Sequence, residues 1–259
     1  MRRLSLADPV ARPAVWSRRL AVFACLLAAV AIGLARLRLA EAPAALTVFG
    51  VALVIAALAA LLAVSAASLI WREGLRGAGQ AAFGFLLSAA LLAYPAYLAA
   101  VAFVRPPIHQ VSTDLAEPPP FLISTKARGA RGGALPAPPD AATEAAQHAA
   151  YPDLVPVEVE MDSSGAYQLA LDAAKELGWR IVDSEPPNLS GDGVALIEAT
   201  SRSLFFGFVS DIAIRIRPGA TRTRIDARAV SRVGGHDFGA NAQRLRKFAM
   251  SLKEDAEER

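Results

Sequence analysis

The residues best suited to ligand binding lie close together near the C-terminal end of the sequence. They carry guanidinium, hydroxyl, carboxylate and amide groups, and they are Arg228, Ser231, Arg232, Asp237, Asn241 and Arg244. A strand end that delivers two guanidinium groups beside the first N–H groups of a helix suits a carboxylate or a phosphate. We therefore take this cluster as the candidate site for an anion or a partner protein.

The same cluster also has a purely structural interpretation, which needs fewer assumptions. Asp237 would cap a helix and Asn241 would satisfy a loop. The arginines would pair with Asp226 and Asp211 across a sheet. The two interpretations differ in whether the guanidinium groups are left available to a ligand.

Other catalytic chemistry has little support in the residue spacing. Residue types of a hydrolase triad occur at Ser112, Thr113 and Asp114, together with His109 or His236, but no nucleophile-elbow glycine pattern surrounds any serine. The three histidines have no metal-ligand spacing, and Cys25 is the only cysteine. We therefore expect no enzyme activity, no metal and no cofactor.

The elements that would position these residues follow from hydrophobic periodicity. Residues 154–161 alternate apolar and polar side chains as a strand does. A helical stripe then follows Asp162, a suitable N-cap, and ends at Gly178. Two further strands, at residues 179–183 and 194–200, flank a turn-rich segment.

The strongest strand signal is a hairpin over residues 211–232. Apolar residues alternate with polar ones on both sides of a turn through Pro218 and Gly219, so one face is apolar and the other basic. A last helix begins near Asp237. The order strand, helix, four strands, helix predicts an α+β domain over residues 151–259, with two helices covering one antiparallel sheet in a helix-grip or TBP-like arrangement.

Such a fold can hold an apolar ligand between its sheet and its last helix. The residues that would line this groove are Phe205, Phe208, Leu245 and Phe248. Large side chains filling the same space would instead favour a non-enzymatic interaction or scaffold module, which uses the basic sheet face. We expect the interaction module first, and a tethered binding domain for a lipid or small apolar ligand as the alternative.

Prolines and glycines dominate residues 105–150, and they disfavour both helices and central strands. We therefore expect an extended linker there, most mobile over residues 126–139. One short helix is predicted at residues 141–149.

Three uncharged apolar runs occupy residues 20–35, 43–70 and 77–104. A membrane-crossing helix needs roughly 20 apolar residues, so the first run spans only if its flanking arginines extend to the headgroups. Residues 1–104 are therefore predicted to form a three-helix, multi-pass transmembrane region. Cleavage of the first run as a signal peptide, near residues 40–42, is the alternative.

Arginines flank these runs unequally. The N-terminal segment and the second loop hold Arg2, Arg3, Arg12, Arg18, Arg19, Arg72 and Arg76, whereas the first loop and the exit of the third run hold Arg36, Arg38 and Arg105. The positive-inside rule then places the N-terminus in the cytoplasm and the C-terminal domain outside it, in the periplasm if the membrane is a bacterial inner membrane. We expect membrane lipids and an envelope protein as partners. The net charge of +3 is largely explained by these arginines, so no nucleic-acid partner is expected.

Specific residues from Ile108 to the C-terminus match a family pattern. They are Ile108, His109, Ser112, Thr113, Asp114, Tyr151, Pro152, Asp153, Pro156, Phe206, Gly207, Phe208 and Asp211, and then Arg224, Ile225, Asp226, Arg228, Val230, Ser231, Arg232, Val233, Gly234, Asp237, Gly239, Asn241, Ala242 and Arg244. On these residues the soluble part resembles the DUF1499 family, a domain of unknown function. Ser210 and Ala229 depart from the pattern. The resemblance supports the fold and implies no activity, and bacterial members that look like this chain are often membrane-anchored.

Overall fold

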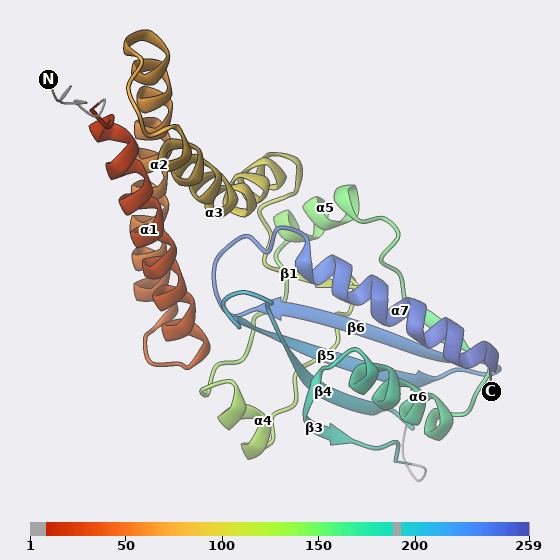
Figure 1. The fold of residues 1–259 in the computed structure, drawn as a ribbon. Helices are drawn as coiled ribbons and strands as arrows, with labels where there is room; N and C mark the ends of the chain where they lie inside the picture. Colours follow the sequence, from red (N-terminus) through yellow and green to blue (C-terminus); the bar gives the residue numbers. More distant parts are fainter. Residues whose placement is uncertain (1–8, 189–192, 259) are drawn as a thin grey trace, which may run out of the picture. The chain divides into compact units, whose positions relative to one another are not determined.

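The structure is a computed structural model that describes residues 9–188 and 193–258. The chain divides into two compact units, Met1–Ala100 and Val101–Arg259 (Figure 1). Arg2 and Arg3, which the orientation argument uses, lie outside the described residues, as does the centre of the turn predicted before residue 194.

The first unit is built from long apolar helices. These are α1 (Arg12–Arg36), α2 (Ala42–Glu73) and α3 (Ala78–Val104). By length and composition, all three are long and apolar enough to cross a membrane. α1 begins eight residues before the predicted apolar run, because Pro13 starts the helix in its first turn and the arginines at 18 and 19 lie within it.

α1 and α2 pack against each other through alanines that are fully buried, such as Ala21 and Ala24 of α1 and Ala52 and Ala56 of α2. Small side chains let helix backbones approach closely, which is the usual way that apolar helices associate in lipid. The fold of this unit therefore fits a membrane anchor.

The second unit contains one antiparallel sheet. Its strands are β1 (Gln110–Ser112), β2 (Val157–Val159), β3 (Arg180–Glu185), β4 (Ala195–Arg202), β5 (Val209–Pro218) and β6 (Thr223–Ser231). The strand order is β1-β6-β5-β4-β3, and β2 also pairs with β6. β1 lies beside the end of β6, where Gln110 faces Val230, and β2 lies beside its start, where Val157 faces Ile225. Two short strands therefore share one edge of the long β5–β6 hairpin.

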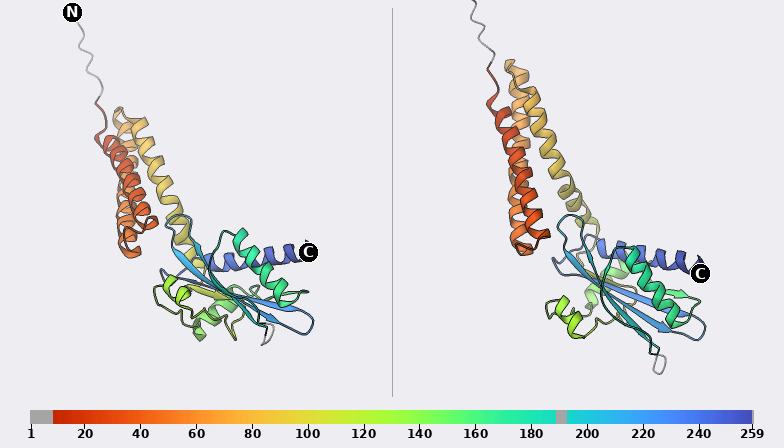
Figure 2. Two further views of the ribbon diagram at one scale, coloured as in Figure 1. Left: turned by 90° about the horizontal axis from the view of Figure 1, so that it is seen from below. Right: turned by 60° about the horizontal axis from the view of Figure 1, so that its bottom comes forward.

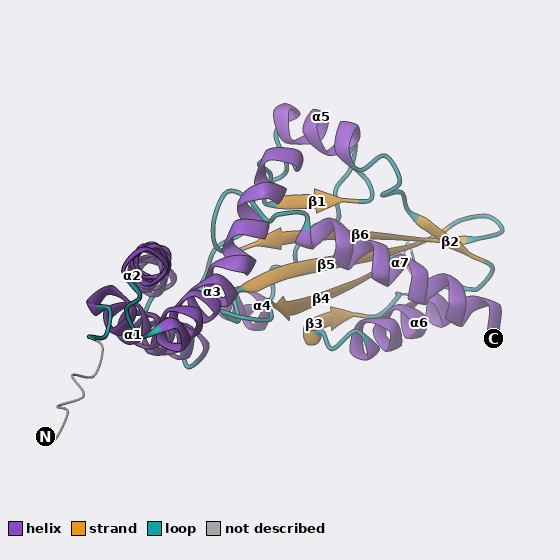
Figure 3. Cartoon of the chain, turned by 45° about the horizontal axis from the view of Figure 1, so that its top comes forward, coloured by secondary structure: helices purple, strands orange, loops and turns teal. Residues whose placement is uncertain are grey.

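Two helices, α6 (Ser163–Glu176) and α7 (Ala240–Glu258), cover one face of this sheet (Figure 3). The main core lies between them and the strands, and it contains Ile197, Ile212, Ile214 and Ile216 from β4 and β5. Asp162 caps α6 by accepting a hydrogen bond from the N–H of Gly165. This α+β layout, with its order β2-α6-β3-β4-β5-β6-α7, agrees with the prediction from periodicity.

The opposite face of the sheet is also covered, and this differs from the expected extended linker at residues 105–150. The segment contains α4 (Thr125–Ala130) and α5 (Ala141–Ala150), and α4 lies on the side of the sheet away from α6 and α7 (Figure 2). Phe121 and Leu122 are at most 5% exposed, and Phe121 packs on Ala213 and Val230. The proline and glycine content predicted an extended chain before residue 141, but apolar side chains between the prolines pack this segment on the sheet. The short helix predicted at residues 141–149 is confirmed by α5.

Candidate functional site

Four of the six predicted site residues lie together around the start of α7. Asn241 is fully buried, and its Nδ2 donates to the carbonyl oxygen of His109 (2.9 Å) and to Ser231 Oγ (3.0 Å). Its Oδ1 accepts a hydrogen bond from Nη1 of Arg244, whose Nε also donates to Ser201 Oγ (3.1 Å). Asn241 therefore joins the N-terminal end of the domain, β6 and α7.

Asp237 acts as the cap of α7. Its carboxylate accepts hydrogen bonds from the N–H groups of Gly239 and Asn241, both at 2.8 Å. These are among the first N–H groups of a helix, which have no partner within the helix itself. The helix N-terminus that sequence analysis offered to an anion is thus already occupied by a carboxylate of the chain.

The other two predicted residues lie on the opposite face of the sheet. Side chains alternate along β6, so Arg228 and Arg232 point away from the face that carries Ser231. Arg232 forms a two-point ion pair with Asp211 of β5, with Nε–Oδ2 and Nη2–Oδ1 distances of 2.8 and 2.6 Å. The hydrogen bonds that Arg232 donates to Asp211 raise the pKa of Arg232, although burial opposes them. This pairing is the cross-strand one that the structural interpretation predicted.

Arg228 is buried to 3% exposure without an acidic partner among the described residues. Its Nη2 donates to Gln110 Oε1 (2.7 Å) and to the carbonyl oxygen of Ala137, and its guanidinium lies 5.2 Å from the ring centre of Phe121. Burial lowers the pKa of Arg228 to about 10. The structural interpretation expected the arginines of the cluster to pair with Asp226 and Asp211, and Arg228 pairs with neither.

The basic face of the β5–β6 hairpin is neutralised by acids, two of which sequence analysis did not connect to it. Asp226 is fully buried, and its Oδ2 lies 3.1 Å from Nη2 of Arg215 and 2.9 Å from Nη2 of Arg217. Asp114, from the segment before α4, contacts three arginines, Arg215 at 3.2 Å, Arg217 at 3.0 Å and Arg224 at 2.8 Å. Glu117 also binds Arg217, at 2.5 Å.

Because of these contacts, the arginines of the basic face that was expected to meet an external anion are already paired within the domain. The same contacts also account for Asp114, which sequence analysis considered for a hydrolase triad. Its carboxylate binds arginines, while Ser112 Oγ donates to the carbonyl oxygen of Asp114 (2.7 Å). Burial raises the pKa of Asp114, but the N–H of Glu117 and the guanidinium groups of Arg224, Arg215 and Arg217 outweigh burial and hold this pKa below its ordinary value.

The groove predicted beneath the last helix is filled. Leu245 and Phe248 belong to the main core and are 1% and 2% exposed, and the Phe248 ring packs 5.1 Å from that of Trp179. Phe205 and Phe208 lie instead in the turn between β4 and β5, where Phe205 is 41% exposed. The four residues therefore do not line a common cavity.

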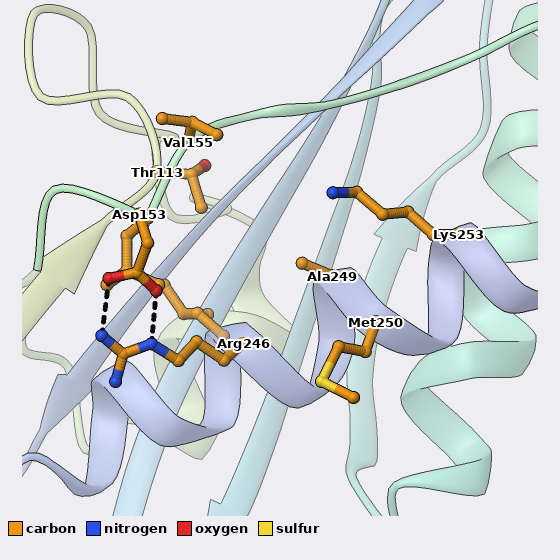
Figure 4. A pocket seen from close by; sticks show the side chains of 9 residues that line it. Thr113, Asp153, Val155, Arg246, Ala249, Met250 and Lys253 are labelled. Carbon is orange, nitrogen blue, oxygen red and sulfur yellow. Dashed lines mark hydrogen bonds and ion pairs between the residues drawn. The ribbon is translucent and has the colours of Figure 1, made fainter.

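One surface pocket lies beside α7, and sequence analysis did not predict it. It has a volume of about 250 Å³ and is lined by Thr113, Asp153, Leu154, Val155, Leu245, Arg246, Ala249, Met250 and Lys253 (Figure 4). Arg246 binds Asp153 through two contacts, of 2.5 and 2.7 Å, at one end of the pocket. Figure 4 shows Lys253 at the other end, with Ala249 between it and the ion pair, Val155 beside Thr113, and Met250 on the Lys253 side. Met250 and Val155 are 58% and 55% exposed.

Among the described residues, no group of three or more His, Cys, Asp or Glu side chains is placed to hold a metal ion. The acids that sequence analysis considered are already bound, Asp114, Asp226 and Asp211 to arginines and Asp237 to backbone N–H groups. The described residues thus include one pocket, beside α7, and several acids that are already paired.

Comparison with known proteins gives one family. No curated protein matches the chain. The model of the family described as "Protein of unknown function (DUF1499)" matches residues 110–252, which include every strand, α6 and most of α7. The matched segment is more than half of the chain and includes the arginine network, Asn241 and the lining of the pocket except Lys253. The chain therefore belongs to the DUF1499 family.

Proposed function

We propose that this chain is a multi-pass inner-membrane protein whose C-terminal domain is a non-enzymatic interaction module on the extracytoplasmic side. The pocket beside α7 carries this proposal. It combines an apolar floor with two exposed hydrophobic side chains, Val155 and Met250, and with a cationic side chain, Lys253, at its edge. This combination suits a protein partner that inserts one apolar side chain beside a carboxylate.

The size of the pocket favours a protein partner over a small molecule. Pockets for drug-sized ligands measure roughly 300–1,000 Å³, and this one has about 250 Å³. The alternative function, binding of a lipid or small apolar ligand, has less support because Leu245 and Phe248 fill the space beneath α7. The helix-grip or TBP-like arrangement remains part of the proposal, supported by the strand order and by the two helices on one face.

Lack of catalysis belongs to the same proposal. Asp114, Asp226 and Asp211 are bound by arginines, and Asp237 caps a helix. A carboxylate that is bound in this way is a poor general base, because its oxygens are already occupied by hydrogen-bond donors.

Photo-crosslinking in native membranes tests the interaction. A photoreactive phenylalanine analogue placed at Met250 of the full-length protein should give a discrete crosslinked product. The same analogue at Gln168, an exposed residue on α6, should not. Lys253→Glu should abolish the product at position 250, because it reverses the charge that would meet the partner's carboxylate. Equal products at both positions, or a product that Lys253→Glu leaves unchanged, would refute the proposed surface.

Topology is tested separately with reporters fused after residue 258. An alkaline phosphatase fusion should be active and a green fluorescent protein fusion routed through the same membrane pathway should be dark. Activity of a C-terminal reporter only in the cytoplasm would remove the extracytoplasmic assignment.

A further inference from the structure

The turn between β4 and β5 presents apolar side chains on a closed, hydrogen-bonded scaffold. Ser203 N–H donates to the carbonyl oxygen of Phe208 (2.9 Å), and Phe208 N–H donates to Ser203 Oγ (3.0 Å). Leu204 and Phe205 are nevertheless 76% and 41% exposed. Because the turn is fixed at its base, these side chains are exposed by the fold itself and not by fraying.

A second apolar side chain is held outward in the loop between β6 and α7. Phe238 is 38% exposed and has φ of +55°, a backbone region that costs energy for a residue with a side chain. Its ring stacks on His236 with centroids 4.5 Å apart, and its N–H donates to His236 Nδ1 (2.9 Å). The backbone strain therefore occurs at Phe238, the residue whose aromatic ring is exposed.

These two loops lie at the same end of the sheet, which we call the aromatic end and define by Leu204, Phe205 and Phe238. The start of β5 pairs with the end of β6, with Ser210 opposite Ser231. Figure 1 shows the β4–β5 turn and the β6–α7 loop side by side at this end, consistent with that pairing.

The chain also enters the domain at the aromatic end. Asp237 N–H donates to the carbonyl oxygen of Ile108 (3.0 Å), and Ser231 N–H donates to that of His109 (2.9 Å). Val104 is the last residue of α3, a helix that is apolar enough to cross a membrane, and Ile108 follows it by four positions in the chain. Four residues reach at most about 14 Å when fully extended. The tether therefore keeps this end of the domain near the place where α3 leaves the bilayer.

The charged side chains that the segments at the aromatic end expose at the surface are all positive. Within residues 103–109, 201–209 and 232–239, the charged side chains are those of Arg105, Arg202, Arg232 and Asp237. Asp237 is buried as the cap of α7, whereas Arg202 is exposed. Aromatic and leucine side chains flanked by arginines are the residues that favour the interface of a bilayer containing anionic lipids.

We propose that the aromatic end is a lipid-docking surface, at which Leu204, Phe205 and Phe238 insert into the bilayer interface and Arg202 contacts anionic phospholipid headgroups. The occupant is the bilayer that holds the three apolar helices. Docking at this end fixes how the domain is oriented above the membrane and leaves the pocket beside α7 as a separate surface. The inference does not depend on the proposed protein partner.

The test uses the full-length protein in nanodiscs of phosphatidylcholine and phosphatidylglycerol with brominated acyl chains, which quench tryptophan at membrane depth. In a background with Trp16→Phe and Trp71→Phe, which retains the buried Trp179, Phe205→Trp reports on the aromatic end. Ala220→Trp is the matched control, because Ala220 is exposed in the turn between β5 and β6 at the other end of the hairpin. Leu204→Trp replaces Phe205→Trp if that variant does not fold.

We expect emission at shorter wavelength and loss of most of the added fluorescence at position 205, and little change at position 220. Arg202→Glu, or omission of phosphatidylglycerol, should reduce the quenching at position 205. Quenching at position 205 no stronger than at position 220 would overturn the proposal. Quenching that is insensitive both to lipid charge and to Arg202→Glu would overturn the assignment of anionic headgroups.

Discussion

Arg131 and Glu198 form an ion pair in which each side chain is only 1% exposed. Arg131 follows α4, and Glu198 lies in the middle of β4. The same two residues bind both polar groups of one backbone unit, because Leu122 N–H donates to Glu198 Oε2 (3.0 Å) and the Leu122 carbonyl accepts from Arg131 Nη2 (2.7 Å). This pair therefore fastens the proline-rich segment to the second face of the sheet.

Removal of one partner should destabilise the domain much more than removal of both. Arg131→Met leaves the Glu198 carboxylate buried without its cation, which typically costs about 3–5 kcal/mol. The double variant Arg131→Met with Glu198→Leu should regain most of the lost stability. It should still be about 1–3 kcal/mol less stable than the native protein, because the N–H and carbonyl groups of Leu122 lose their partners. Urea unfolding of the full-length protein in detergent, followed by Trp179 fluorescence after Trp16→Phe and Trp71→Phe, measures both. A double variant no more stable than Arg131→Met would contradict this account.

The loss in Arg131→Met should also depend on pH. Burial raises the pKa of Glu198, although Arg131 opposes it. Without Arg131 this pKa rises further. An acid whose pKa is higher in the folded state favours folding below its unfolded pKa, and that contribution is lost as pH rises through the folded pKa. The destabilisation should therefore be smaller in mildly acidic solution than at neutral pH, as the same unfolding experiment would reveal.

Arg228 provides the matched contrast, since it lies beside the same ring of Phe121 but has no carboxylate partner among the described residues. Arg228→Met removes an uncompensated buried charge and at the same time two hydrogen bonds. We expect a loss at neutral pH of no more than about 1 kcal/mol, well below that of Arg131→Met. A loss as large as that of Arg131→Met would indicate that the guanidinium of Arg228 is compensated in a way that the structure does not explain.

The sign of the pH effect follows from the pKa of Arg228, which burial lowers to about 10. The unfolded chain keeps this proton to higher pH than the folded protein does, so stability rises as pH increases through the folded pKa. The native protein should therefore gain stability relative to Arg228→Met as pH rises through 10, from about pH 9 to about pH 11. Comparison of urea midpoints at the two pH values measures the difference.

Much of the fold follows from local sequence signals. The alternation in β5 and β6, the cap Asp162 before α6 and the cap Asp237 before α7 each act within a few residues, so they are readable without a structure. β1 has only three residues and depends on pairing with residues 228–230, more than a hundred positions away. Such a strand has no local signal, and neither has the burial of Phe121 against Ala213.

The spatial grouping of the predicted site residues is found in part, for the same reason. Asn241, Ser231 and Arg244 do meet at the start of α7. Arg228 and Arg232 were wrongly placed with them, although the period of β6 already assigns even-numbered residues to the other face. The partners of the arginines, Asp114 and Glu117, come from about a hundred residues earlier, and no spacing rule connects them.

Asp114 should make the domain sensitive to acid. Its contacts with Arg224, Arg215 and Arg217 lower its pKa in spite of burial, so its contribution to stability is present above the unfolded pKa of about 3.9 and is lost as pH falls through the lower folded pKa. Asp114→Asn should be less stable than the native protein at neutral pH, and this difference should shrink in acid. Asp172→Asn, which removes an exposed ion pair on α6, should change stability little at any pH. Parallel acid dependences for Asp114→Asn and the native protein would count against the network.

In the first unit, Gly84 of α3 sets how closely α3 approaches α1. A Cβ atom at this position would lie 2.9 Å from the backbone nitrogen of Arg18 and closer still to Ser17 Oγ, so any side chain must push the two helices apart. Gly84→Ala should therefore cost about 1–3 kcal/mol through overpacking. Gly50→Ala in α2 is the matched control, because a Cβ there meets nothing within 4 Å. Thermal unfolding of the two variants in detergent should lower the transition temperature only for Gly84→Ala. If both substitutions were equally harmless, the contact between α1 and α3 at Gly84 would not be close in the protein.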